Sequence, residues 1–191
     1  MLLFSLRVFA FNLHPQVQWL KNPCTPMKIL LISRQPSILI SVEAADGSLV
    51  QTQLSLPEKE GFQLAYDPAT LAPALLDPIV QWLTLYAKRK NSPFPLPLDT
   101  SLNSPFTKQV WKQLQKIPFG QTASYADLAV QVKNPKAARA VGNACGANPF
   151  PLFIPCHRVL ATGGKLGGFS CGIEIKKRLL AFEEIPYTEK S

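Results

Sequence analysis

Residues 124–147, SYADLAVQVKNPKAARAVGNACGA, decide how the second half of this 191-residue chain folds. Ser124 and Asp127 match a capping box, in which a serine at a helix start and an acidic residue three places later each accept a backbone N–H. Asn134-Pro135 interrupts the helical pattern, and Pro135 suits the start of a second helix. Two short helices with a tight break predict a helix-turn-helix, although most short helix pairs simply pack against each other.

The second of these helices consists mostly of residues with small side chains. Residues 136–147 are mostly alanine and glycine, and Arg139 is the long cationic side chain in their middle. A helix that presses its backbone into a narrow groove needs small residues, and many minor-groove proteins insert a side chain between base steps. Close packing against another helix, with Arg139 as a solvated charge, explains the same residues without DNA.

Further helices are predicted on both sides of this pair. Residues 104–117 open with Ser104 as a good N-cap and Pro105 at the first helical position. Residues 174–183, EIKKRLLAFE, form a last helix whose lysines we expect to face outward. The residues expected to face inward are Phe106, Val110, Trp111 and Leu114 in the first helix and Ile175, Leu179 and Leu180 in the last.

Cys156 and His157 are adjacent in the stretch before the last helix. A thiol is a good nucleophile only as a thiolate, so it needs a nearby base, cation or helix N-terminus. Neighbouring side chains of an extended segment point to opposite sides, so a direct Cys–His bond needs a bend, and otherwise a bridging water carries the proton. A carboxylate completes such a relay, and we favour Glu183 over Asp127 and Glu184. A buried structural cysteine beside a surface histidine is the plain alternative.

Residues 163–170, GGKLGGFS, form a glycine-rich stretch without phosphate-loop spacing. They predict a flexible loop that wraps a ligand, in which Phe169 supplies a stacking face and Ser170 a polar contact. As a plain turn, the same loop needs no function.

The first half of the chain has the pattern of a small sheet followed by one helix. Residues 28–54 contain β-rich runs with a hairpin signal at Asp46-Gly47, and they predict two or three antiparallel strands. Residues 71–90 carry apolar residues at helical spacing and end in three cationic residues, which favours a helix C-terminus. The proline-dense residues 91–105 predict a linker. The apolar positions of the helix are Leu75, Ile79, Trp82, Leu83 and Tyr86.

The net charge of +8 is concentrated in the second half. Residues 1–100 hold eight Lys and Arg against seven Asp and Glu, whereas residues 101–191 hold twelve against five. The second half therefore attracts a polyanion, although a basic surface alone has the same signature. The chain has four cysteines and only two histidines, and no two cysteines form a C-x-x-C pair. The cysteines match no common zinc or disulfide framework, and unpaired cysteines favour a reducing compartment. These cysteines are Cys24, Cys145, Cys156 and Cys171.

Residues 1–26 are expected to be an N-terminal extension of unknown role, with Met27 as an alternative natural start. The apolar opening MLLFSLRVFAFNL has no basic n-region and no A-x-A site, and Arg7 interrupts it, so it does not match a signal peptide. It is too short to span a bilayer, and no other stretch is long and apolar enough for a membrane helix.

IPCHRV, at residues 154–159, completes a recognisable pattern. With NPKAARAVGNACGANPFP before it (134–151) and GGFSCGIEIKKRLLAFE after it (167–183), it resembles the O6-alkylguanine-DNA alkyltransferase family, the methylated-DNA–protein-cysteine methyltransferases. The resemblance covers roughly residues 104–184 in order. Residues 1–100 share only the general layout of a small sheet plus a helix.

The resemblance implies a two-domain α+β protein. Residues 27–100 would form an N-terminal domain with a small antiparallel sheet and a helix, ribonuclease H-like, and its linker. Residues 101–187 would form a helical, winged-helix-like domain with a helix-turn-helix that binds DNA. The boundary is expected near residue 100, in the proline-dense linker.

The resemblance also implies catalytic roles for four residues. Cys156 matches the alkyl-accepting cysteine, and His157 and Glu183 match the relay that takes the thiol proton through a water. Tyr125 matches the tyrosine that helps to rotate the nucleotide out of the duplex and assists the leaving base.

Further residues are implied to contact DNA or the flipped base. Arg139, with Ala138 beside it, matches the arginine that fills the vacated place in the duplex. Asn148 matches the hinge asparagine that ties the cysteine loop to the recognition helix. The implied pocket consists of the Val159 carbonyl, which reads the guanine amino group, the Phe169 ring, and Ser170 near the O6 atom.

Two positions depart from the family pattern. Phe169 replaces a tyrosine of several members, so stacking survives without a phenolic contact, and Cys171 replaces a small glycine, which narrows the pocket. Some members bind zinc in the N-terminal domain, but the N-terminal candidates here are only His14 and Cys24, so we expect no such site.

The function implied is stoichiometric DNA repair. The alkyl group of O6-alkylguanine, and of O4-alkylthymine, would move to Cys156 and inactivate the protein without a cofactor. We expect a cytoplasmic or DNA-associated monomer that binds duplex DNA through the minor groove. The rival classes are a module that binds alkylated DNA without transfer, and a thiol hydrolase with the same Cys-His-Glu set.

Overall fold

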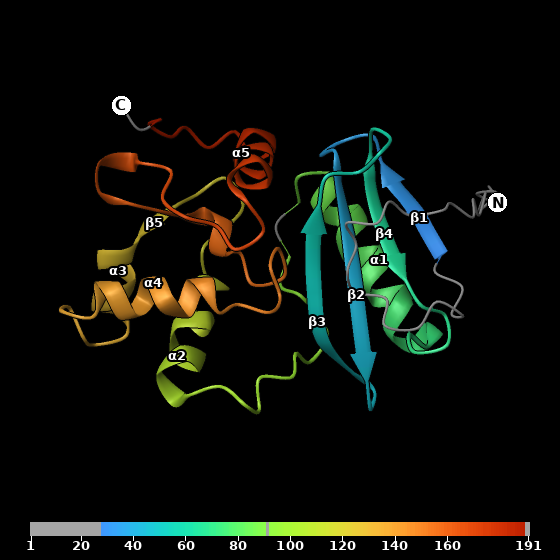
Figure 1. The fold of residues 1–191 in the computed structure, drawn as a ribbon, viewed down its shortest axis with the longest axis horizontal. Coiled ribbons are helices and arrows are strands. Elements are labelled where there is room, and N and C mark those ends of the chain that lie inside the picture. The colour runs from blue at the N-terminus through green and yellow to red at the C-terminus, as the bar shows by residue number, and fades with distance from the viewer. Residues whose placement is uncertain (1–27, 91, 190–191) are drawn as a thin grey trace.

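The computed structural model describes residues 28–90 and 92–189 (Figure 1). A sheet and one long helix form the N-terminal half, residues 28–90, and shorter helices with their loops form the C-terminal half, residues 105–189. This mixed architecture confirms the predicted α+β class. None of the helices in the described ranges is long and apolar enough to cross a membrane.

The sheet of the N-terminal half contains the predicted hairpin. Its second and third strands are joined at Asp46-Gly47, where both residues have positive φ (50° and 74°), as the Asp-Gly hairpin turn requires. The strand order is β1-β4-β2-β3, with β1 at Lys28–Ser33, β2 at Ile38–Ala45, β3 at Ser48–Ser55 and β4 at Phe62–Tyr66.

The prediction of a purely antiparallel sheet is wrong. β4 lies between β1 and β2, antiparallel to β1 but parallel to β2. Its sequence, FQLAY, follows the segment in which strands were expected, and no local signal identifies its partners. Ile40 and Leu64 are paired in register between β2 and β4, and both are fully buried. Parallel strands are normally apolar and buried, and β2 and β4 meet that condition in the middle of the sheet.

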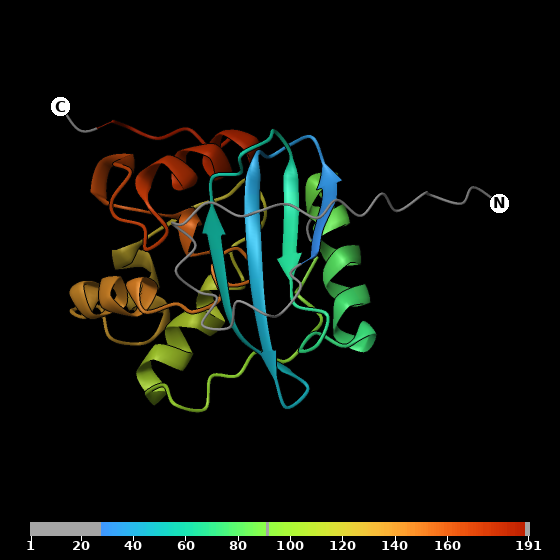
Figure 2. The same cartoon turned by 45° about the vertical axis from the view of Figure 1, so that its right-hand side comes forward.

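α1 (Pro73–Ala87) lies along one face of the sheet (Figures 1 and 2). Its buried side chains are the ones predicted from helical spacing, and Pro73 occupies a first-turn position that tolerates proline. The cationic residues expected in the last turn lie just after the helix end. The buried residues are Leu75, Ile79, Trp82, Leu83 and Tyr86.

The C-terminal half contains the predicted pair of short helices, α3 (Tyr125–Gln131) and α4 (Ala138–Gly146), which pack against each other. α2 (Pro105–Leu114) also packs against α4. Ser104 Oγ accepts the Thr107 N–H at 3.2 Å. Ser124 Oγ accepts the Asp127 N–H at 3.1 Å, while Asp127 accepts the Ser124 N–H at 2.8 Å. Both predicted caps are confirmed. The last helix is α5 (Ile173–Phe182).

α4 begins later than predicted. Pro135 lies in a turn that the Ala137 N–H closes by donating to Asn134 O at 2.9 Å, and the helix starts at Ala138. Asparagine followed by proline suits the first two positions of a β-turn, so the turn takes the proline that we had placed at the helix start. Arg139 is consequently the second residue of α4.

One apolar core runs through both halves of the molecule. Thr52 of β3 donates its N–H to Pro149 O at 2.8 Å, and the Trp82 ring of α1 meets the Phe153 ring edge to face at 5.3 Å. Residues 150–154 are all buried. The loop that leads to Cys156 is therefore supported by the N-terminal half.

Candidate active site

Cys156 begins a single 3-10 turn, Cys156–Arg158, directly after Pro155. Its side chain is almost fully buried, with 4% of the residue exposed. Asn148 Nδ2 donates to Cys156 Sγ at 3.1 Å and to Ile154 O at 2.9 Å, and Asn148 Oδ1 accepts the Phe150 N–H at 3.0 Å. Since Asn148 follows the end of α4, this one side chain connects that helix to the cysteine loop.

The resting thiol of Cys156 is protonated at neutral pH. Burial raises its pKa to about 11, although the Asn148 N–H and the nearby Lys176 ammonium both favour the thiolate. An unassisted thiol in this position is a poor nucleophile. Attack by Cys156 on an electrophile therefore requires a base.

The structure places His157 against Glu183, with Nε2 and Oε1 2.8 Å apart and both side chains fully buried. Burial lowers the pKa of His157 more than the neighbouring carboxylate raises it, so the imidazole is neutral at pH 7. Because an ionised carboxylate only accepts hydrogen bonds, Nε2 carries the proton and Nδ1 is the basic nitrogen. Nδ1 is buried and has no hydrogen-bond partner among the described residues.

The other two carboxylates that we considered lie elsewhere. Asp127 accepts hydrogen bonds from Ser124 at the start of α3. Glu184 is exposed and paired with Arg89.

Glu183 accepts hydrogen bonds from two further side chains that sequence reasoning missed. Arg158 donates from Nε at 2.8 Å and from Nη2 at 3.0 Å, and Tyr86 donates its hydroxyl at 2.8 Å. The Gly120 N–H adds a contact at 3.2 Å. Burial alone would raise the pKa of Glu183, but the interactions with His157 and Arg158 lower it to about 2. The position of Arg158 beside His157 was a usable signal, because a buried guanidinium requires a carboxylate, whereas nothing in the sequence indicated Tyr86.

The expectation that the lysines of the last helix face outward is wrong for Lys176. This residue is fully buried, and its ammonium donates to Val159 O at 2.7 Å, Leu166 O at 2.5 Å and Gly168 O at 3.2 Å. Burial lowers its pKa to about 8. The apolar part of the side chain packs in the core and the ammonium donates to three carbonyls. Hydrophobic periodicity does not predict such a buried lysine. The Val159 carbonyl expected to read the base is one of these three acceptors.

Tyr125 and the glycine-rich loop approach each other near the cysteine loop. Strands of two residues, β5 (Ala123–Ser124) and β6 (Val159–Leu160), pair in parallel and bring the start of α3 beside the segment after Cys156. The half-buried Tyr125 leaves little space at Gly167, where an added Cβ would lie 3.2 Å from its hydroxyl. A glycine with φ of 64° permits this approach.

Phe169 and Ser170 are held differently. The Phe169 ring meets the His157 imidazole edge to face, with centroids 6.5 Å apart. Ser170 is exposed, and its Oγ lies 4.0 Å from Cys171 Sγ. The structure thus brings Phe169 to the relay, while Ser170 lies on the surface.

The outer face of α4 is exposed at Arg139 and Ala140 and half-buried at Ala138. The opposite face buries Val141, Ala144 and Cys145. The small residues Ala144 and Cys145 therefore serve the packing of α4, while Ala138 and Ala140 leave its other face accessible.

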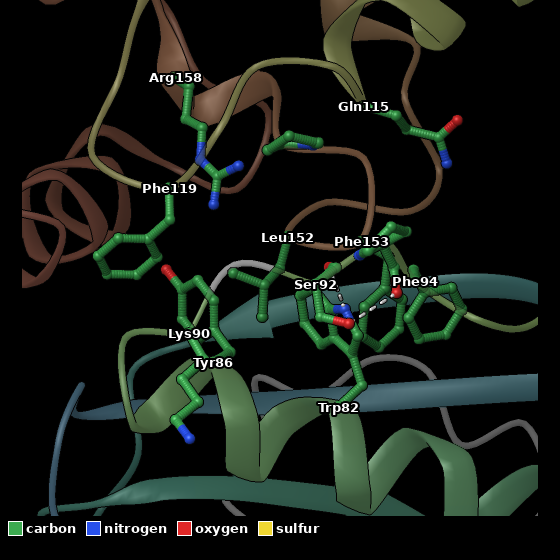
Figure 3. Close-up of a pocket in the computed structure, with 12 residues that line it drawn as sticks. Trp82, Tyr86, Lys90, Ser92, Phe94, Gln115, Phe119, Leu152, Phe153 and Arg158 are labelled. Carbon is green, nitrogen blue, oxygen red and sulfur yellow. Dashed lines mark hydrogen bonds between the residues drawn. The ribbon is translucent and has the colours of Figure 1, made fainter.

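A cavity of about 240 Å³ lies between α1 and the cysteine loop (Figure 3). Aromatic rings of both halves form much of its wall, and Pro155 and Arg158, on either side of Cys156–His157, complete it. Within residues 28–90 and 92–189, no group of three His, Cys, Asp or Glu side chains is placed to hold a metal. The N-terminal candidates for zinc, His14 and Cys24, lie outside the described residues.

Comparisons with known proteins agree on one family. Residues 105–185 match the model of the 6-O-methylguanine DNA methyltransferase, DNA binding domain. A methylated-DNA–protein-cysteine methyltransferase of Mycolicibacterium paratuberculosis is 35% identical over 159 residues, which are 83% of this chain and 88% of that relative. A probable methylated-DNA–protein-cysteine methyltransferase of Acanthamoeba polyphaga mimivirus is 49% identical over 100 residues, 52% of this chain and 66% of the relative, slightly less than two thirds.

A solved structure extends the similarity to the fold. The crystal structure of Mycobacterium tuberculosis OGT in complex with DNA is 34% identical and superposes with a TM-score of 0.59, covering 76% of this chain and 93% of that one.

Proposed function

Because this chain belongs to the methylated-DNA–protein-cysteine methyltransferase family, we propose that it repairs DNA by moving an alkyl group from O6-alkylguanine onto Cys156. The observation that carries this proposal is the arrangement around the sulfur. Cys156 is held by Asn148 and adjoins a buried His157–Glu183 pair whose free nitrogen is basic. O4-alkylthymine is a second substrate, whose alkyl group would be transferred to Cys156 by the same reaction.

The reaction follows from the protonation states of the resting site. His157 Nδ1 takes the thiol proton, through a water, while Glu183 stabilises the imidazolium that forms. The Sγ–carbon bond forms as the O6–carbon bond breaks, and guanine leaves with the electron pair. Hydrogen bonds from Tyr125 and Ser170 offset the negative charge that develops on the base. The thioether product is stable, so each molecule reacts once.

DNA recognition is assigned to the C-terminal half. α4 enters the minor groove, where its small residues allow close approach, and Arg139, with Ala138 beside it, fills the place of the flipped nucleotide. The basic charge of this half supports the assignment. Phe169 stacks on the base, and the Val159 carbonyl, which the Lys176 ammonium fixes in position, reads its amino group.

Several finer assignments belong to the same proposal. The N-terminal half is ribonuclease H-like and the C-terminal half winged-helix-like, with the domain boundary near residue 100. The protein acts as a monomer in the cytoplasm, nucleoid or nucleus, and it needs no cofactor.

The variant Cys156→Ala tests the assignment of the acceptor. A duplex that carries one labelled O6-methylguanine should bind to this variant as it binds to the wild type, because no DNA contact is lost. Labelled methyl should be found on the wild type alone. Label on Cys156→Ala would refute the assignment.

A further inference from the structure

Tyr86 reaches the relay from the opposite half of the molecule. It lies in the last turn of α1, only 2% of the residue is exposed, and its hydroxyl donates to Glu183 Oε1 at 2.8 Å. Figure 3 shows its side chain extending from α1 toward Phe119 and Arg158. Tyr86 is outside residues 105–185, which the family model covers.

We infer that Tyr86 is a positioning residue of alkyl transfer, through which the N-terminal half sets the strength of the Glu183–His157 hydrogen bond. This inference deepens the proposed function and rests on it. Tyr86 acts through Glu183 and not on the substrate.

The geometry at Glu183 Oε1 supports this role. This one oxygen accepts from the Tyr86 hydroxyl, His157 Nε2 and Arg158 Nη2. Donors to the same oxygen share its electron density, so the Tyr86 hydroxyl weakens the hold of the carboxylate on the imidazole. Burial, followed by the charge of Glu183, keeps the pKa of Tyr86 well above its usual range, so the hydroxyl remains a donor at every working pH.

The ring of Tyr86 is fixed without its hydroxyl. It stacks on Trp82 with centroids 5.6 Å apart, and contacts Phe119 at 5.6 Å and Phe182 at 5.4 Å. Tyr86→Phe therefore keeps the packing and removes one hydrogen bond. Glu183 retains its donors from His157, Arg158 and Gly120.

The sign of the expected pH effect follows from the groups around the relay. Glu183 interacts with Tyr86 from α1 and with Arg158 from the cysteine turn. His157 interacts with Glu183, with Arg158 and, from α5, with Lys176. Removing the Tyr86 donor makes the carboxylate a stronger acceptor, which raises the pKa of His157. Only the neutral imidazole accepts the thiol proton. As the pH is lowered, the transfer rate of the variant should therefore begin to fall at a higher pH than that of the wild type.

The experiment measures the single-turnover rate of methyl transfer from a duplex with one O6-methylguanine, at saturating duplex, across the acid side of the pH profile. Wild type is compared with Tyr86→Phe and with Tyr66→Phe, which makes the same chemical change in β4 of the same half. We expect Tyr86→Phe to move the acid limb upward by about half a pH unit, the effect of one hydrogen bond on a coupled group. Tyr66→Phe should leave the limb in place.

An NMR titration of the imidazoles measures His157 directly and does not depend on transfer. The chain has only two histidines, so the assignment is simple. 3-Fluorotyrosine at position 86 keeps the shape of the side chain and donates more strongly, so it should shift both readouts in the opposite direction, including in a case where Tyr86→Phe does not fold.

An equal loss of rate at every pH, with an unmoved His157 titration, would overturn the inference and leave Tyr86 a packing residue. The same shift in Tyr66→Phe would do so as well. If the wild type accepts no methyl group, the proposed function fails instead, and the NMR titration still decides the coupling between Tyr86 and His157.

Discussion

The network around Glu183 and the outer face of α4 differ in how they hold the residues to which we assign functions. Glu183, His157 and Arg158 are buried, and each hydrogen-bonds to another of the three. Arg139 is exposed on α4 and Ser170 is exposed on the glycine-rich loop. In the proposed function, alkyl transfer would depend on side chains that are also part of the core, whereas DNA recognition would depend on exposed side chains that the fold does not need. Substitutions should separate the two regions by their effect on the free energy of unfolding.

Glu183→Gln should have the largest effect. It leaves the buried Arg158 guanidinium without a counter-charge, so the free energy of unfolding should fall by about 3–5 kcal/mol, and transfer should be lost. Urea denaturation measures the first effect and a transfer assay the second. Glu184→Gln is the matched control, because its carboxylate pairs with Arg89 at the surface and should matter little. Equal losses in the two variants would show that the buried network around Glu183 contributes no more than a surface ion pair.

Lys176→Met should have an intermediate effect. The methionine fills the space of the lysine stem but leaves two buried carbonyls, Val159 and Leu166, without this donor, which should cost about 1–3 kcal/mol of unfolding free energy. Lys177→Met, one position along α5 and paired with Glu189 at the surface, is the control and should unfold like the wild type. A Lys176→Met protein as stable as this control would show that the ammonium contributes nothing to the fold.

Arg139→Ala should have the smallest effect on stability, indistinguishable from zero in the same denaturation. Its effect should fall on recognition: transfer from alkylated duplex DNA should slow about tenfold, with little change for the free base O6-benzylguanine. Lys112→Ala, an exposed cation on α2, controls for the general loss of positive charge. Equal losses of transfer rate on duplex and free base would contradict a role of Arg139 in nucleotide flipping. Another residue of α4 would then have to fill the vacated place in the duplex.

The sequence predicted the features that depend on neighbours along the chain. The caps at Ser104 and Ser124, the buried face of α1 and the hairpin at Asp46-Gly47 are each determined within a few residues. The adjacency of Cys156 and His157 was likewise visible. Whether the ten candidate site residues perform their assigned roles stays a prediction.

The features that were missed depend on distant partners. β4 takes its direction from strands on both sides of it, and Tyr86 meets Glu183 across 97 positions of sequence. Lys176 was placed outside because charged side chains are rarely buried, and only the three carbonyls of the folded loops make its burial favourable. Local patterning therefore predicted most of the elements, whereas tertiary contacts determine the place of β4 and the side chains around the sulfur.

Intact mass spectrometry after exposure to O6-benzylguanine tests the central claim most directly. The account predicts one benzyl increment per molecule, mapped by peptide analysis to Cys156, and no further reaction on a second exposure. An unchanged mass, an increment on Cys145 or Cys171, or release of more than one guanine per protein would contradict it.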